Sequence, residues 1–172
     1  MGARDLGLLL LRAGVGAAIA SHGAQKLFGW FGGGGLQGTA GAMEAMGFRP
    51  GDRSALLAGL AEGAGGTILA LGLATRPAAA AVAGNMTAAS SVHAANGFFN
   101  TEGGFELPAT YAWVASSLAV AGPGTYSLDH VTRDVLNKPW MGVVGFVGAA
   151  AMAAYLISQR STDTATPQES PE

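Results

Sequence analysis

Four ionisable side chains lie within, or at the ends of, strongly apolar segments of the sequence. His22 and Lys26 close a run that begins at Leu6, and their i, i+4 spacing places them on one face of a helix. Glu62 and His93 lie in two later apolar runs. An ionisable group at membrane depth has to be protonated, paired or in contact with water, and such groups commonly mark ligand, ion or proton sites. These four residues are therefore the candidate site.

A purely structural explanation is open as well. Glu62 can form an ion pair with Lys26 or His22 that braces neighbouring helices, and a histidine near a helix end can reach the lipid head groups. Arg12 and Asn85 also lie in apolar runs, but we expect them to serve packing or snorkelling and leave them out of the site.

Other kinds of site find little support in the sequence. Two histidines and a glutamate could supply metal ligands, but their spacing forms no local metal motif, so we predict no metal site. The net charge of −2, without a basic cluster, indicates that nucleic acid is not a partner. The absence of cysteine excludes disulfides, cysteine-ligated iron–sulfur clusters and thiol chemistry. A redox role would therefore depend on a bound molecule.

The composition is typical of an integral membrane protein. Of the 172 residues, 49% are hydrophobic and 12% are charged, whereas a soluble domain carries about 25% charged residues. Between Ser54 and Phe99 the only charged side chains are Glu62 and Arg76. We therefore expect an all-α integral membrane protein whose helices contact the lipid bilayer.

Five apolar runs are expected to form helices that cross the membrane in alternating directions, at residues 6–28, 54–74, 77–95, 107–122 and 139–158. We expect the first to be an uncleaved span, because Arg12 interrupts it and further runs follow. The fourth is the shortest, below the ~20 residues that cross an untilted bilayer.

Residues 36–48 are expected to form a short interfacial or re-entrant helix, or else a packed loop. The polar tail, residues 160–172, is expected to be disordered.

The distribution of charge and of small residues predicts how these helices are arranged. The loop 96–106 contains two glutamates and no Lys or Arg, so we place it outside the cell and the amino terminus inside. With alternating directions, all four candidate residues then lie in the same half of the membrane. Gly59, Gly63 and Gly66 recur on one helical face, which predicts that another helix approaches closely.

Four segments of the sequence resemble the DoxX family of small bacterial membrane proteins. They are HGAQKLFGWFGG at 22–33, EGAGGTILALGLATRPAA at 62–79, NMTAASSVHAANGFF at 85–99 and GPGTYSLD at 122–129. The resemblance runs from about residue 10 to residue 129. It implies an antiparallel four-helix transmembrane core within residues 1–138, to which residues 139–159 add a fifth, carboxyl-terminal transmembrane helix.

DoxX-like proteins are associated with membrane oxidoreductases, including quinone-linked oxidation of thiosulfate. The resemblance thus implies a redox-associated subunit of the bacterial inner membrane, with a quinone as cofactor and membrane or redox proteins as partners. In this hypothesis His22, Lys26 and His93 bind the quinone and Glu62 is the catalytic proton carrier. Two alternatives stay open: a non-catalytic assembly or stabilising subunit of a respiratory complex, and a small-molecule or proton pathway.

Overall fold

The computed structural model of the chain describes residues 2–158 and 160. Within them the backbone forms helices joined by turns, with no strand. The expected all-α architecture is confirmed for this part of the chain, and each of the five apolar runs forms one long helix. The α-helices are α1 (Ala3–Phe28), α2 (Gly35–Ala45), α3 (Gly51–Leu71), α4 (Thr75–His93), α5 (Glu106–Ala121), α6 (Leu128–Val131) and α7 (Pro139–Ser158), and the short 3₁₀ turns are η1 (Trp30–Gly32), η2 (Ala94–Asn96) and η3 (Asn100–Glu102).

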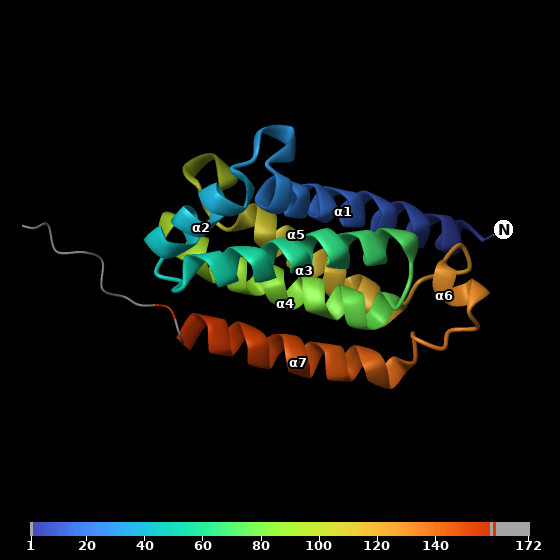
Figure 1. Ribbon diagram of the computed structural model, residues 1–172. Helices are drawn as coiled ribbons and strands as arrows, with labels where there is room; N and C mark the ends of the chain where they lie inside the picture. The colour runs from blue at the N-terminus through green and yellow to red at the C-terminus, as the bar shows by residue number, and fades with distance from the viewer. Residues whose placement is uncertain (1, 159, 161–172) are drawn as a thin grey trace, which may run out of the picture.

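Three of the helices, α1, α3 and α7, are long and apolar enough to cross a membrane, so the chain is a membrane protein. Consecutive long helices run in opposite directions (Figure 1). The alanine-rich α4 has 19 residues and α5 has 16, and neither meets the same criteria of length and hydropathy. The spanning of α4 and α5, and with it the complete four-helix core plus a fifth helix, stays a prediction.

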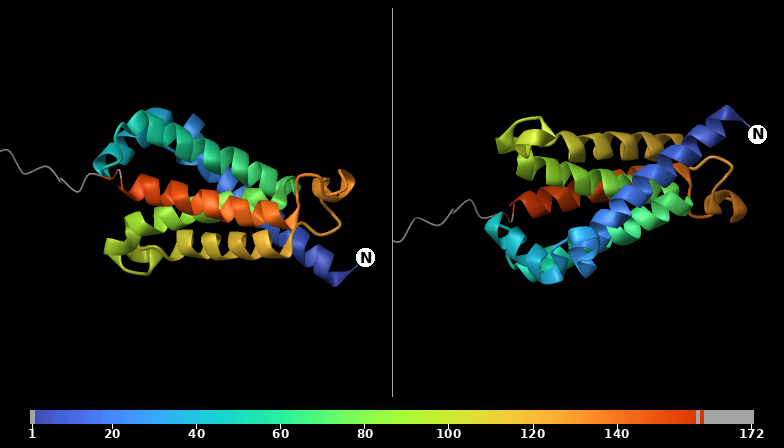
Figure 2. Two further views of the ribbon diagram at one scale, coloured as in Figure 1. Left: turned by 90° about the horizontal axis from the view of Figure 1, so that it is seen from below. Right: turned by 90° about the horizontal axis from the view of Figure 1, so that it is seen from above.

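Helices α1 and α3 cross with their backbones in contact (Figure 2). A Cβ atom added to Gly16 would lie 2.5 Å from the backbone nitrogen of Ala70, and one added to Gly66 would lie 2.5 Å from that of Ala20. Gly23 meets the backbone of α3 in the same way. The expected close approach at the glycine repeat is therefore confirmed, and the neighbouring helix is α1.

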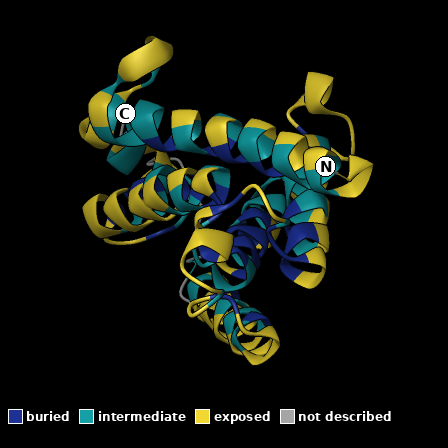
Figure 3. Cartoon of the chain, turned by 90° about the vertical axis from the view of Figure 1, so that its right-hand side faces the viewer, coloured by how far each residue is buried: buried dark blue, intermediate teal, exposed yellow. Residues whose placement is uncertain are grey.

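The buried side chains form two clusters between the helices. One contains Ile19, Val82, Ala83, Met86 and Ala115, and the other contains Leu69, Ala79, Ala80, Leu118 and Ala119. The outward faces of the helices are largely exposed (Figure 3). On α7 these faces are apolar, with Val143 at 64% and Val147 at 66% exposure. Such a distribution suits helices whose outer surface contacts lipid.

Hydrogen bonds of Arg12 and Asp129 connect the helices at the end of the molecule where α1 begins and α3 ends. Arg12 is only 1% exposed, so it does not snorkel, and its Nη1 donates to the Ala70 carbonyl at 2.5 Å while Nη2 donates to the Tyr126 carbonyl. Asp129 is fully buried and caps α4 by accepting from the backbone N–H of Thr75 at 2.8 Å and from its hydroxyl at 2.7 Å. These hydrogen bonds tie the segment after α5 to α1, α3 and α4.

Candidate functional site

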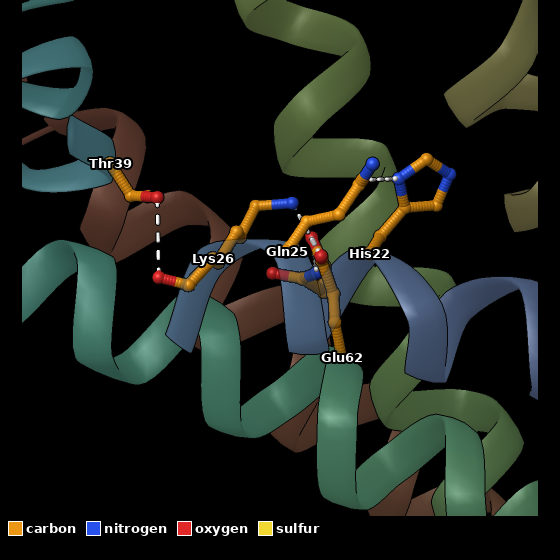
Figure 4. Close-up of polar contacts among 6 residues, drawn as sticks. His22, Gln25, Lys26, Thr39 and Glu62 are labelled. Carbon is orange, nitrogen blue, oxygen red and sulfur yellow. Dashed lines mark hydrogen bonds and ion pairs between the residues drawn. The ribbon is translucent and has the colours of Figure 1, made fainter. Parts of the chain in front are cut away.

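The centre of the site is an ion pair between α1 and α3. Lys26 lies in the last turn of α1 and Glu62 lies midway along α3. The glycine crossing brings the helices close enough for Lys26 Nζ to lie 2.5 Å from Glu62 Oε2 (Figure 4). The Glu62 side chain is 6% exposed and the Lys26 side chain 26% exposed. From α4, Asn85 Nδ2 donates to Glu62 Oε1 at 3.3 Å. Both carboxylate oxygens of Glu62 thus accept a hydrogen bond from a neighbouring helix.

The polar cluster formed by Lys26, Glu62 and Asn85 lies in the wall of a cavity of about 600 Å³, which is bounded mainly by α3, α4 and α7. Helix α7 packs chiefly on α4, which leaves space between α7 and α3. Met43 of α2, together with Met46 and Phe48 from the turn after it, covers one end. Apart from the polar cluster, the lining consists mostly of alanine, valine, leucine and methionine side chains. A largely apolar cavity of this size with a few converging polar groups is typical of a small-molecule site.

His93 lines the same cavity near the end of α4. Its Nδ1 lies 3.0 Å from the Gly103 carbonyl oxygen. A carbonyl only accepts, so Nδ1 carries the hydrogen and Nε2 of the neutral ring is left as an acceptor. Asn85 lies eight residues before His93 on α4, which corresponds to about 12 Å along the helix. The cavity therefore has two separate polar groups, one at the ion pair and one at His93.

His22 is not among the residues that line the cavity. Its Nδ1 lies 3.0 Å from Gln25 Oε1 (Figure 4). Its ring meets the Tyr111 ring edge-on, with centroids 6.3 Å apart. The structure thus brings together three of the four predicted site residues, Lys26, Glu62 and His93. His22 instead faces α5.

Asn85 is the site residue that the sequence reasoning missed. We expected it to serve packing, yet it joins α4 to the ion pair and lines the cavity. The available signal was an amide in the middle of an apolar helix, where an unpaired polar group is costly. The sequence also predicted a short helix within 36–48 without indicating that Met43, Met46 and Phe48 would cover a cavity.

The aromatic residues after Lys26 lie at the surface of the molecule. Phe28, Trp30 and Phe31 are 64%, 60% and 71% exposed, and the Phe28 and Trp30 ring centroids are 5.2 Å apart. Exposed aromatic rings at the end of a membrane-crossing helix are typical of the membrane interface. Lys26, two residues before Phe28, is therefore the member of the ion pair nearest these aromatic residues along the chain.

Comparison with known proteins identifies the family. The sequence model of the family described as DoxX matches residues 7–95, just over half of the chain. The matched region contains most of α1 and all of α2, α3 and α4, and hence Lys26, Glu62, Asn85 and His93. No curated protein and no solved structure gives a significant match. The chain belongs to the DoxX family.

Proposed function

We propose that this DoxX-family protein binds a small apolar carrier with a polar head group, a quinone being the class that fits best, and serves as a redox-associated subunit of the bacterial inner membrane. The observation that carries the proposal is the contact of the buried Glu62 with the half-buried Lys26 and Asn85 in the wall of an otherwise apolar cavity. A quinone combines carbonyl oxygens that need donors with a ring and tail that need apolar surroundings.

Each polar group has a role in this proposal. The Lys26 ammonium and the Asn85 amide retain donors that can bind a head-group oxygen, and the Glu62 carboxylate accepts a proton from the reduced form of the carrier. One quinone ring does not reach across the 12 Å or so between Asn85 and His93, so the ring contacts the ion pair alone. His93, with Nε2 as an acceptor nearer the end of α4, passes protons between the cavity and the surface.

The proposal includes a route for the ligand. Helices α3 and α7 bound the cavity on two sides, and its lining includes exposed apolar residues such as Leu57, Val144 and Met152. A lipid-soluble carrier can therefore enter from the bilayer between α3 and α7. Water is kept from this path by the same apolar faces.

A matched pair of glycine substitutions tests the cavity without touching the ion pair. Gly148 lines the cavity and a Cβ added there meets nothing within 4 Å. Gly148→Leu should therefore fold normally yet fill space that the ligand needs, weakening binding of a soluble quinone analogue by about tenfold or more. Gly14→Leu is the control, because Gly14 also has nothing within 4 Å but lies on α1 outside the cavity.

Binding would be measured by titrating the analogue into the detergent-purified protein, alongside mass spectrometry of copurified lipid-soluble molecules. If the parent does not bind the analogue, or if Gly148→Leu binds it as the parent does, the quinone site is wrong. A stable complex with respiratory proteins and no ligand would favour an assembly subunit. Flux across liposomes would favour a small-molecule or proton pathway.

A further inference from the structure

Helices α1 and α7 begin at the same end of the molecule, beside α6 (Figure 1). A second cavity, of about 400 Å³, is lined by residues at this end, away from the ion pair. Three cationic side chains line it: Arg4 in the first turn of α1, Arg76 in the first turn of α4 and Lys138 just before α7. His130 lines it as well. Cationic side chains from distant parts of the sequence therefore lie around one cavity.

The three cationic side chains differ in how firmly their positions are fixed. Arg76 Nη1 donates to the carbonyl oxygens of Ala119 at 2.9 Å and Val120 at 2.6 Å, so the end of α5 fixes the position of its guanidinium group. Arg4 and Lys138 are exposed, and their long side chains can close on a ligand. The cavity therefore offers one fixed and two adjustable cations.

Two carboxylates also line the cavity, and each accepts a hydrogen bond from an uncharged group. Asp5 Oδ1 accepts from the backbone N–H of Thr125 at 3.1 Å, and Asp134 Oδ1 accepts from Asn137 Nδ2 at 3.2 Å. Within the part of the chain that the structure describes, neither carboxylate forms a salt bridge with the cations of the cavity. With three cations against two carboxylates, the cavity keeps an excess of positive charge.

This end of the molecule lies at the level of the lipid head groups. Both α1 and α7, which are long and apolar enough to cross the membrane, begin here. Trp140 in the first turn of α7 is 60% exposed, and Val131 and Val135 between α5 and α7 are 75% and 60% exposed. Exposed aromatic and apolar side chains beside a polar hollow are typical of the membrane interface.

We propose that this second cavity binds a phosphate group, that of an anionic phospholipid. Phosphate oxygens accept from arginine and lysine at once, and basic pockets between transmembrane helices on the cytoplasmic side bind anionic head groups. The distribution of Lys and Arg predicts that this end is cytoplasmic. The acyl chains have apolar surface next to the cavity on α7, where Val143 lies one helical turn after the lining residue Pro139 and is 64% exposed. A free phosphate ion has the same oxygens but gains nothing from this apolar surface.

The test is lipid binding to the full-length protein in neutral detergent, followed by native mass spectrometry with phosphatidylglycerol, phosphatidylcholine or inorganic phosphate. The variant Arg4→Gln/Lys138→Gln should bind phosphatidylglycerol about thirtyfold more weakly than the parent, as expected for the loss of two basic residues near the head group. The variant Arg4→Lys/Lys138→Arg, which keeps both charges, should retain binding. Arg133→Gln is the control, since Arg133 is an exposed cation of the same connection that does not line the cavity. Circular dichroism would check that each variant is folded.

Three results would overturn the lipid site: equal binding of phosphatidylglycerol by the parent and the double glutamine variant, an equal loss in Arg133→Gln, or no preference over phosphatidylcholine. Displacement of the lipid by inorganic phosphate at equal concentration would assign the cavity to free phosphate and exclude the lipid as its source. Retention of phosphatidylglycerol in excess phosphate supports the head-group site.

Discussion

At the scale of single residues, the ion pair between Lys26 and Glu62 is the feature that most constrains the site. A carboxylate that is 6% exposed loses most of its hydration, and hydrogen bonds from Lys26 and Asn85 replace the lost water contacts at its two oxygens. Replacing one member of the pair should therefore lower the stability of the fold strongly, whereas replacing both members should lower it much less.

We predict that Lys26→Met lowers the free energy of unfolding by about 3 kcal/mol, since it leaves the Glu62 carboxylate buried without its cation. Glu62→Gln should cost only about 1 kcal/mol, because glutamine keeps a hydrogen-bonding partner for Asn85 and Lys26 is partly exposed. The double variant Lys26→Met/Glu62→Gln should be more stable than Lys26→Met alone. Chemical denaturation in detergent measures all three, and strictly additive losses would contradict the predicted coupling.

The sequence predicted the site only as far as helical spacing allows. Lys26 and Glu62 could be expected to meet, since both are ionisable, apolar surroundings disfavour either alone, and antiparallel helices place them at one depth. The direction of His22 could not be predicted. Residues 22 and 26 share a helical face, but the contact of His22 with Gln25 and Tyr111 depends on how α5 packs against α1. Asn85 was missed for the same reason, because its partner lies on another helix.

At the scale of the elements, the crossing of α1 and α3 positions the ion pair. Gly23 lies three residues before Lys26, and Gly63 follows Glu62 directly, so the closest backbone contact is adjacent to the charged side chains. The spacing of the glycines indicated a close approach, but not which helix would make it. The five long helices were predictable from apolar runs, whereas the four-residue α6 depends on local capping by Ser127, whose Oγ accepts from the backbone N–H of His130.

We predict that Gly23→Ala destabilises the protein by about 1–3 kcal/mol, because the new methyl group would overlap the backbone of Gly63 and force α1 and α3 apart. It should also weaken quinone-analogue binding, as Lys26 then no longer reaches Glu62. The matched control is Gly14→Ala, where a Cβ meets nothing within 4 Å and helix propensity is gained. Denaturation in detergent compares the two, and equal stability would mean that the helices do not cross this tightly.

At the scale of the whole molecule, two cavities lie toward opposite ends of one helix bundle, and the residues that line them differ in chemistry. The first is apolar with an ion pair whose carboxylate is buried, and the second is polar with an excess of cations. If the helices cross the membrane as the apolar runs predict, the first cavity opens toward the bilayer between α3 and α7, and the second lies near the cytoplasmic membrane surface. Whether α5 crosses is the point on which this arrangement depends, since its 16 residues extend about 24 Å against a hydrocarbon core of about 30 Å.

The topology can be tested directly because the chain has no cysteine. Asn100 lies in η3 before α5 and Thr132 lies just after α6, and both are exposed, so a cysteine at either position should be tolerated and reactive. We predict that an impermeant maleimide labels intact cells at Asn100→Cys and not at Thr132→Cys, because α5 separates the two positions and the loop 96–106 lacks Lys and Arg. Labelling of both after cell lysis is the control for reactivity. The reverse pattern in intact cells would invert the orientation and place the cationic cavity outside, whereas labelling at both positions would show that α5 does not cross the membrane.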